Sequence, residues 1–217
     1  MATTGPDHET LMWAESRAIA DTLDGLDDAS FDHATLCAGW RVRDVISHML
    51  LGHTTPMPKM VLMLGKYGFN VPKASLKGSI DFGTEHSPAE LRAAWRGVVD
   101  GKTRRGITKV IPTKEGFVDH MIHLQDILRP LGRSRAIPAD HLTAALDVMP
   151  TLGGFVKSKQ RMKGLRWRAT DVDWTWGDGP EVVGPAEALI LLASGRTAPL
   201  PEVSGDGVDT LRQRLAT

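Results

Sequence analysis

The chain has 217 residues, and its 26 Lys and Arg side chains balance 26 Asp and Glu side chains, so its formal net charge is zero. This balance predicts no nucleic-acid partner and no membrane partner, because the whole molecule carries no field that attracts a polyanion or an anionic surface. The single cysteine, Cys37, excludes an intramolecular disulfide framework and a cysteine-rich zinc site. Without a leader pattern or an apolar run of about 20 residues, the chain is expected in the cytoplasm.

The first part of the chain is predicted to be mostly helical. Apolar residues at helical spacing predict an amphipathic helix over about residues 7–25 and a second helix that begins near Arg41. This second helix places His48 on the flank of its apolar stripe. A Met-rich helix follows Pro58, whereas the stretch Tyr67–Thr84, which is rich in Gly, Lys and Pro, predicts a loop.

Three more helices are predicted before the chain changes character. The sequence Ser87–Glu90 combines an N-cap, a proline at the first helical position and a glutamate three residues on, which predicts a helix of roughly 15 residues. A long helix is expected from near Thr113 to near Leu131, where Gly132 supplies a stop. Another helix follows Pro138.

The last part of the chain has the pattern of a small α/β segment. Leu165–Thr170 alternates like a half-buried strand, and Gly177–Gly179 offers a turn before a second strand. Pro185–Ser194 then reads as an apolar helix. The whole pattern predicts a mainly α protein, with an up-and-down four-helix bundle over residues 1–160 and a small C-terminal α/β domain over residues 161–217.

The long helix that begins near Thr113 carries a candidate metal site. Asp119 and His123 are four residues apart, so an α-helix places both on one face, where they can bind one divalent ion. Asp126 lies on the same face. This polar stripe can equally face solvent, and the wide apolar arc of the helix is what favours an internal cleft. His48 is the best candidate for a third ligand, although a lone histidine at such a boundary is more often simply hydrogen-bonded.

Several segments then follow one another in an order that matches a known family. They are Thr35–His48, His123–Ile127 with Leu131-Gly132, Ala169–Trp174, and Gly184–Leu189 with Gly195-Arg196. Together they resemble the DinB-like, mycothiol-dependent maleylpyruvate isomerase family, and the likeness spans most of the chain. The resemblance implies a DinB-like four-helix bundle followed by a small C-terminal α/β domain.

The resemblance also implies a set of metal ligands. They are His48, Asp119 and His123, with zinc as the expected ion and mycothiol as the expected thiol cofactor, for which no binding residues are implied. The family usually has Glu where this chain has Asp119. Asp is also a competent oxygen ligand, but its shorter side chain can change the geometry or the metal preference.

Three other side chains have two interpretations each. Asp126 would orient a ligand or a bound water, or form a surface salt bridge. By the resemblance, Arg196 would hold a substrate carboxylate through its bidentate fork, or it would neutralise the C-terminus of the helix over residues 185–195. Cys37 is expected to be a small packing residue rather than a nucleophile.

The expected function is that of a metal- and mycothiol-dependent isomerase or S-transferase acting on a small electrophile, either a maleylpyruvate-like acid or a xenobiotic. A divalent metal favours the thiolate form of a bound thiol at neutral pH. Attack on an electrophilic carbon gives isomerisation if the adduct eliminates after bond rotation, and S-transfer if the adduct persists. The alternative is a non-catalytic, DinB-like metal-binding protein for a small ligand or a protein partner. A purely structural helical protein would bind no metal, and both monomer and homodimer stay open.

Overall fold

The computed structural model describes residues 7–154 and 156–216 and divides the chain into two compact units, Asp7–Ser134 and a C-terminal unit that begins at Arg135. The boundary expected between residues 160 and 161 therefore lies inside the C-terminal unit. The reason is that helix α7 (Ala139–Val148), which the sequence assigned to the bundle, packs against helix α9 (Ala186–Ala193) of the C-terminal unit.

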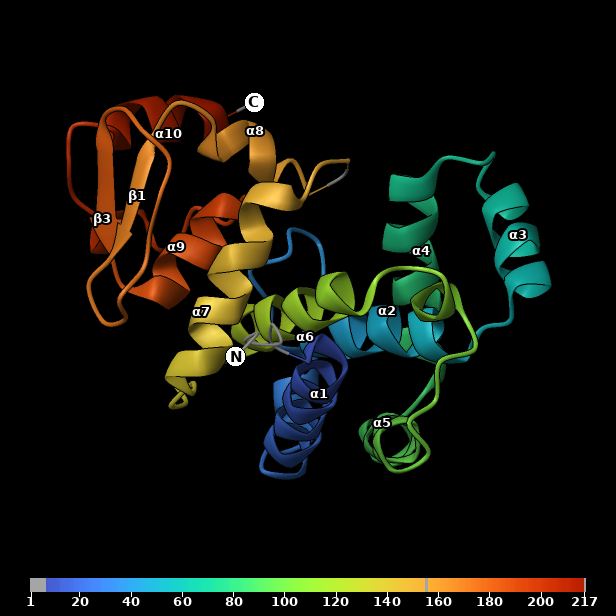
Figure 1. The fold of residues 1–217 in the computed structure, drawn as a ribbon. Coiled ribbons are helices and arrows are strands. Elements are labelled where there is room, and N and C mark those ends of the chain that lie inside the picture. The colour runs from blue at the N-terminus through green and yellow to red at the C-terminus, as the bar shows by residue number, and fades with distance from the viewer. Residues whose placement is uncertain (1–6, 155, 217) are drawn as a thin grey trace. The chain divides into compact units, whose positions relative to one another are not determined.

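The N-terminal unit is helical (Figure 1). Its α-helices are α1 (His8–Asp24), α2 (Val42–Thr54), α3 (Met57–Lys66), α4 (Val71–Glu85), α5 (Pro88–Asp100) and α6 (Thr113–Leu128), and short 3-10 helices lie at Ala29–Asp32 and Ile107–Lys109. Helices α1, α2, α5 and α6 pack on one another, which confirms the predicted four-helix bundle. The pair α3 and α4 is inserted in the chain between α2 and α5, and α4 packs along α2.

Each helix of the bundle gives the core a large side chain that is at most 1 % exposed, and these are Met12, Ile46, Trp95 and Phe117. Burying each contributes about 1.5–3 kcal/mol relative to leaving it in water. The capping box predicted before α5 is also present, because the Ser87 N–H donates to the Glu90 carboxylate at 2.8 Å and the Glu90 N–H donates to Ser87 Oγ at 3.3 Å.

Helix α4 differs from the sequence-based prediction. The stretch Tyr67–Thr84 was expected to be a loop, but Val71–Glu85 is a helix with Asn70 as its N-cap. Its glycines, which suggested a loop, allow close packing on α2 instead. A Cβ atom on Gly83 would lie 2.7 Å from Oδ1 of Asp44, so any larger residue would push the two helices apart.

The C-terminal unit is the small α/β segment that the sequence predicted, although it begins earlier. Besides α7 and α9 it contains α8 (Ser158–Met162), α10 (Val208–Leu215), β1 (Arg166–Ala169), β2 (Thr175–Trp176) and β3 (Glu181–Gly184), with 3-10 helices at Met149–Thr151 and Leu200–Glu202. The strand order is β2-β1-β3, with β1 antiparallel to β2 and parallel to β3. Helix α9 packs against β1 and β3. Among the helices of the described residues, none is both long enough and apolar enough to cross a membrane.

Candidate metal centre

Three side chains from two helices of the bundle converge on one point. His48 lies on α2, and Asp119 and His123 lie one turn apart on α6. One ligand atom from each of the three residues can be chosen so that all lie within 4.8 Å of one another. The centroids of the two imidazole rings are 5.2 Å apart. The structure thus brings together the three residues predicted as metal ligands. In the sequence, His48 is at least 71 positions from the other two.

The arrangement fits a divalent cation. Nε2 of His123 lies 3.4 Å from Oδ1 of Asp119, close to the roughly 3.3 Å edge of a tetrahedron with ligand distances of about 2.0–2.1 Å. Two imidazole nitrogens and one carboxylate oxygen form a donor set that zinc takes in sites with an open position. The side chain of Asp119 is 45 % exposed, so this corner of the site is reachable from solvent. The shorter carboxylate of Asp119 is therefore compatible with a metal centre here.

The polar face of α6 lies in the interior of the unit rather than in solvent. Within residues 116–128, Asp119 is partly exposed and every other residue is buried, including His123 and Asp126. Buried imidazole and carboxylate groups need hydrogen-bonding or charged partners. The stripe is thus not a solvated helix face, and Asp126 does not form a surface salt bridge.

Asp126 contacts the opposite edge of the His123 ring. Its Oδ2 atom lies 2.9 Å from Nδ1 of His123 and accepts a hydrogen bond from the thiol of Cys37 at 3.0 Å. Because Nδ1 of His123 is held by this carboxylate, Nε2 is the nitrogen that faces Asp119. A carboxylate in this position fixes the orientation and tautomer of a ligand histidine. Cys37, expected to be a packing residue, therefore takes part in the hydrogen bonding behind His123.

His48 has neighbours that were not predicted as site residues. Oγ of Ser75, on α4, lies 3.3 Å from Nδ1 of His48, and the Trp40 ring lies 5.0 Å from the His48 ring between centroids. Trp40 Nε1 in turn donates to the carbonyl oxygen of Leu76 at 3.3 Å. No sequence pattern singled out Ser75, because its segment was expected to be a loop. Recognising Asn70 as an N-cap is the signal that places Ser75 on a helix.

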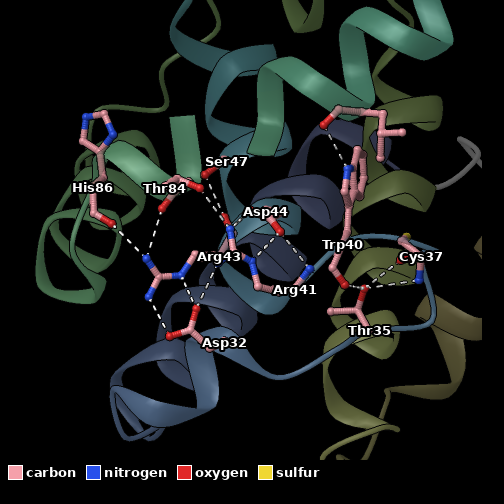
Figure 2. Close-up of polar contacts among 12 residues, drawn as sticks. Asp32, Thr35, Cys37, Trp40, Arg41, Arg43, Asp44, Ser47, Thr84 and His86 are labelled. Carbon is pink, nitrogen blue, oxygen red and sulfur yellow. Dashed lines mark hydrogen bonds and ion pairs between the residues drawn. The ribbon is translucent and has the colours of Figure 1, made fainter. Parts of the chain in front are cut away.

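The turn before α2 is held by arginine–carboxylate contacts (Figure 2). Nε of Arg41 donates to Oδ2 of Asp44 at 2.9 Å, and the same oxygen accepts from the main-chain N–H of Arg41 at 2.9 Å. Arg43 pairs with Asp32 at 3.0 Å, and its NH1 group donates to the carbonyl oxygen of Gly83 at 3.2 Å. These contacts fix the start of α2, and the residues just before it, against the end of α4.

The nearby carboxylates set the charge of His123. Burial acts to lower its pKa, but the charge of Asp119 and the hydrogen bonds to Asp119 and Asp126 outweigh burial, so the pKa of His123 is raised well above its ordinary value. Partial burial acts to raise the pKa of Asp119, but the charge of His123 lowers it below its ordinary value. A metal ion that binds Nε2 of His123 must therefore displace a proton.

Arg196, the predicted catalytic residue, lies in the C-terminal unit directly after α9. It is half-buried, and its NH1 group donates to the carbonyl oxygen of Ser194 at 3.3 Å. Its main-chain N–H donates to the carbonyl oxygen of Leu191 at 2.9 Å. The side-chain contact is with the C-terminal end of the helix, which agrees with the alternative role expected from the sequence.

Two family models match the chain. The model of the mycothiol maleylpyruvate isomerase N-terminal domain matches residues 12–105, and that of the MDMPI C-terminal domain matches residues 136–214. His48 lies within the first match. Asp119 and His123 lie between the two matches, so their assignment depends on the geometry described above.

Two solved structures are similar to this chain. One is a crystal structure of the mycothiol-dependent maleylpyruvate isomerase, with 17 % identity, 92 % of each chain covered and a TM-score of 0.60. The other is the same enzyme with a histidine-to-alanine substitution, with 16 % identity, 92 % of each chain covered and a TM-score of 0.59. At these identities the likeness shows the fold. No curated protein sequence matches the chain.

Proposed function

The chain belongs to the mycothiol maleylpyruvate isomerase family, and on this premise we propose that it is a metal- and mycothiol-dependent isomerase of small, unsaturated, electrophilic acids of the maleylpyruvate type. Family membership supports an enzyme of the isomerase kind and mycothiol as its thiol cofactor. The observation that carries the metal dependence is the convergence of ligand atoms from His48, Asp119 and His123.

A divalent ion at this point, zinc in our proposal, would supply one chemical property, the deprotonation of a coordinated thiol at neutral pH. The protein's own residues hold the ligand atoms in place. Asp126 fixes the ring of His123, and Ser75 contacts Nδ1 of His48. Such support reduces the reorganisation that the ligands would otherwise undergo. Asp119 and His48 are both partly exposed whereas His123 is buried, so thiol and substrate would approach on the side of Asp119 and His48.

Arg196 is proposed to bind a carboxylate of the substrate. A guanidinium group offers two parallel N–H donors that match the two oxygens of a carboxylate. The segment Gly195-Arg196 resembles the position that the family uses near its active site, and the side chain is half-buried.

The test supplies the purified, untagged protein with zinc, mycothiol and maleylpyruvate, and separates the cis and trans products by chromatography. We expect turnover that needs both zinc and mycothiol and that is lost in His123→Ala. Arg196→Ala should keep its metal and raise KM by about 10- to 100-fold, because a hydrogen-bonded charge pair contributes about 1.5–3 kcal/mol.

Two other outcomes would contradict isomerisation. A stable thiol adduct without a trans product would assign S-transfer to the same site. Full metal occupancy without turnover of any unsaturated acid tested would favour the non-catalytic metal-binding protein.

A further inference from the structure

The pair α3 and α4 exposes a concentration of large apolar side chains. We call residues Met57–Lys77 the hairpin surface. Its exposed apolar residues, with exposed fractions from 37 % to 75 %, are Met57, Val61, Leu62, Phe69, Val71 and Leu76. In the rest of the described N-terminal unit, the comparable residues are Ile107 and Val110. Apolar groups gathered in one region of a surface commonly mark an interaction site.

Helix α3 is unusual because none of its ten residues is buried. One side of α3 packs on α4, where Met63 lies against Gly78. Figure 1 shows α3 beside α4. Val61 and Leu62, the two residues before Met63, are 50 % and 75 % exposed. A helix this short gains little from its own hydrogen bonds, so its stability depends on the packing of its apolar side chains. The exposed apolar side of α3 is therefore available for a further contact.

The tip between the two helices holds an aromatic ring in solvent. Phe69 has a backbone φ of 57°, a left-handed conformation that is uncommon for a bulky residue. Its main-chain N–H donates to the carbonyl oxygen of Leu64 at 2.8 Å, which stabilises this conformation. The side chain of Phe69 nevertheless remains 69 % exposed. The end of the ring lies against Gly65 of α3, where a Cβ atom would be 3.8 Å from Cζ of Phe69, so the ring covers this end of α3 and leaves most of its surface to solvent.

The hairpin surface is also basic. It contains Lys59, Lys66, Lys73 and Lys77 and no acidic residue, in a chain whose net charge is zero. Lys66 pairs with Asp81 at 2.9 Å, and the other three lysines are exposed. The prediction of no membrane partner was based on the zero net charge of the whole molecule. That sum does not show the local excess of positive charge on the hairpin surface.

We propose that the hairpin surface binds an anionic lipid surface, with Leu62 and Phe69 entering the headgroup region and the lysines facing anionic headgroups. Apolar side chains flanked by lysines are the composition of elements that lie in a membrane interface. Lysine suits this position because its alkyl stem can lie along apolar groups while its ammonium remains with the headgroups.

Other occupants fit the hairpin surface less well. A two-fold contact with a second copy would place the lysines of one chain against those of the other, and like charges repel. A protein partner of acidic character would normally meet a groove that takes its apolar side chains. Here the most exposed groups, Leu62 on the side of α3 and Phe69 at the tip, lie on the surface and are 75 % and 69 % exposed.

The test measures cosedimentation of the whole protein with vesicles of phosphatidylcholine alone or mixed with phosphatidylglycerol. We expect binding to the mixed vesicles only, weakened by added salt. Lys59→Glu combined with Lys73→Glu should lower the partition coefficient by about tenfold or more. Leu62→Asp combined with Phe69→Asp should lower it as much. All four side chains are exposed, so the circular dichroism spectrum should be unchanged.

Val110→Asp is the matched control, because Val110 is 62 % exposed and lies outside the hairpin surface. Failure to bind mixed vesicles, or an equal loss in the Val110 variant, would overturn the proposal. So would a dimer in sedimentation velocity that Leu62→Asp and Phe69→Asp dissociate without any vesicle binding, since that result assigns the surface to a second copy. Neither measurement involves metal or turnover, so the outcome is separate from that of the proposed function.

Discussion

Two histidine pairs lie on the same two helices of the bundle in opposite electrostatic surroundings. His48 on α2 and His123 on α6 lie with Asp119 in the candidate metal centre. His53 on α2 and His120 on α6 lie against each other, with their Nε2 atoms 3.0 Å apart. Each helix therefore contributes one histidine to each pair.

The hydrogen-bond partners of the second pair are neutral groups. Nδ1 of His53 donates to the carbonyl oxygen of Thr103 at 2.7 Å, and Nδ1 of His120 lies 2.9 Å from Oγ of Ser16. The Trp95 ring lies 5.6 Å from His53 and 5.5 Å from His120, between centroids. Burial lowers the pKa of His53, and burial together with His53 lowers the pKa of His120 to about 3. Both rings are therefore neutral at pH 7, and Nε2 of His53 accepts from Nε2–H of His120.

The difference between the pairs comes from the carboxylates rather than from the histidines. Along α6, His123 has Asp119 four residues before it and Asp126 three residues after it, and both contact its ring. His120 has Gly116 four residues before it and His123 three residues after it, so neither corresponding position carries a carboxylate. Carboxylates favour a positive ion at the first pair, whereas at the second pair burial outweighs the charge of Asp119 and disfavours one. The same residue type on the same helices is thus a candidate ligand in one place and part of the core in the other.

The largest expected effect follows from removing the carboxylate that faces Nε2 of His123. Loss of a residue that only orients a ligand weakens metal binding by up to about 100-fold. Because Asp119 is itself a proposed ligand, Asp119→Ala should weaken zinc binding by more than this. Asp119→Glu restores the residue that the family usually has, and it should keep affinity within about tenfold of wild type. Competition with a chromophoric chelator measures both. Unchanged affinity in Asp119→Ala would mean that the metal binds elsewhere.

The neutral pair should matter for stability and not for metal. His120→Ala opens a cavity and leaves a polar atom of His53 without its partner, so the free energy of unfolding should fall by about 2–4 kcal/mol. Urea denaturation of the metal-free protein measures this change. Zinc affinity of the folded variant should remain that of wild type, and a variant that keeps its stability but loses zinc would reverse the roles of the two pairs.

The two pairs should also give opposite dependences of stability on pH. The pKa of His120 is about 3 in the folded protein against 6.5 when unfolded, so the unfolded chain binds more protons between these values. This contribution is complete above pH 6.5 and is lost as the pH falls toward about 3. The raised pKa of His123 has the opposite sign, because its contribution is complete below pH 6.5 and is lost as the pH rises through the folded pKa.

Urea unfolding of the metal-free protein across this pH range tests these signs. His53→Leu combined with His120→Leu should flatten the acidic decline, whereas His123→Gln should flatten the alkaline one. A decline on the acidic side that survives in the double variant would assign it to carboxylates elsewhere in the fold.

A smaller effect is expected at Asp126, which holds the far edge of the His123 ring. Asp126→Asn keeps the shape but removes the charge, and zinc affinity should fall by about 10- to 100-fold. Asp44→Asn is the matched control, because Asp44 is another buried carboxylate of the same unit that pairs with Arg41 and not with a ligand. The control should lose stability and keep its zinc affinity when measured by titration calorimetry.

The smallest effect is expected at Ser75, whose hydroxyl contacts Nδ1 of His48. Ser75→Ala should weaken zinc binding by less than about tenfold, because one neutral hydrogen bond contributes about 0.5–1.5 kcal/mol. Ser79 lies one turn further along α4, and its buried hydroxyl has no hydrogen-bond partner. Ser79→Ala should therefore leave zinc binding unchanged, and equal effects of the two substitutions would point to a general change in α4.

Local sequence signals predicted the bundle well. The periodicity of α1, α2 and α6 and the capping box before α5 depend on residues a few positions apart, and these helices are confirmed. Helix α4 was missed because its glycines suit a loop as well as a close helix contact, and the one local signal for a helix, the N-cap Asn70, was not recognised.

The three proposed ligands were named from the sequence, His48 among them through the family resemblance, but the contacts that support them were missed. Asp119, His123 and Asp126 share one helix face, which spacing alone can indicate. The contact of Cys37 with Asp126 joins residues 89 positions apart, and that of Ser75 with His48 joins two helices. Neither contact has a periodic signature, because both depend on how separate elements pack.

The central claim is that the carboxylate-bearing pair, and not the neutral pair, forms the metal centre. Mass spectrometry of the metal content of wild type, His123→Ala and His120→Ala, each purified without chelator or polyhistidine tag and supplied with zinc, tests it most directly. We predict near-stoichiometric metal in wild type and in His120→Ala, and almost none in His123→Ala. Wild type without bound metal, or equal metal content in wild type and His123→Ala, would contradict the claim.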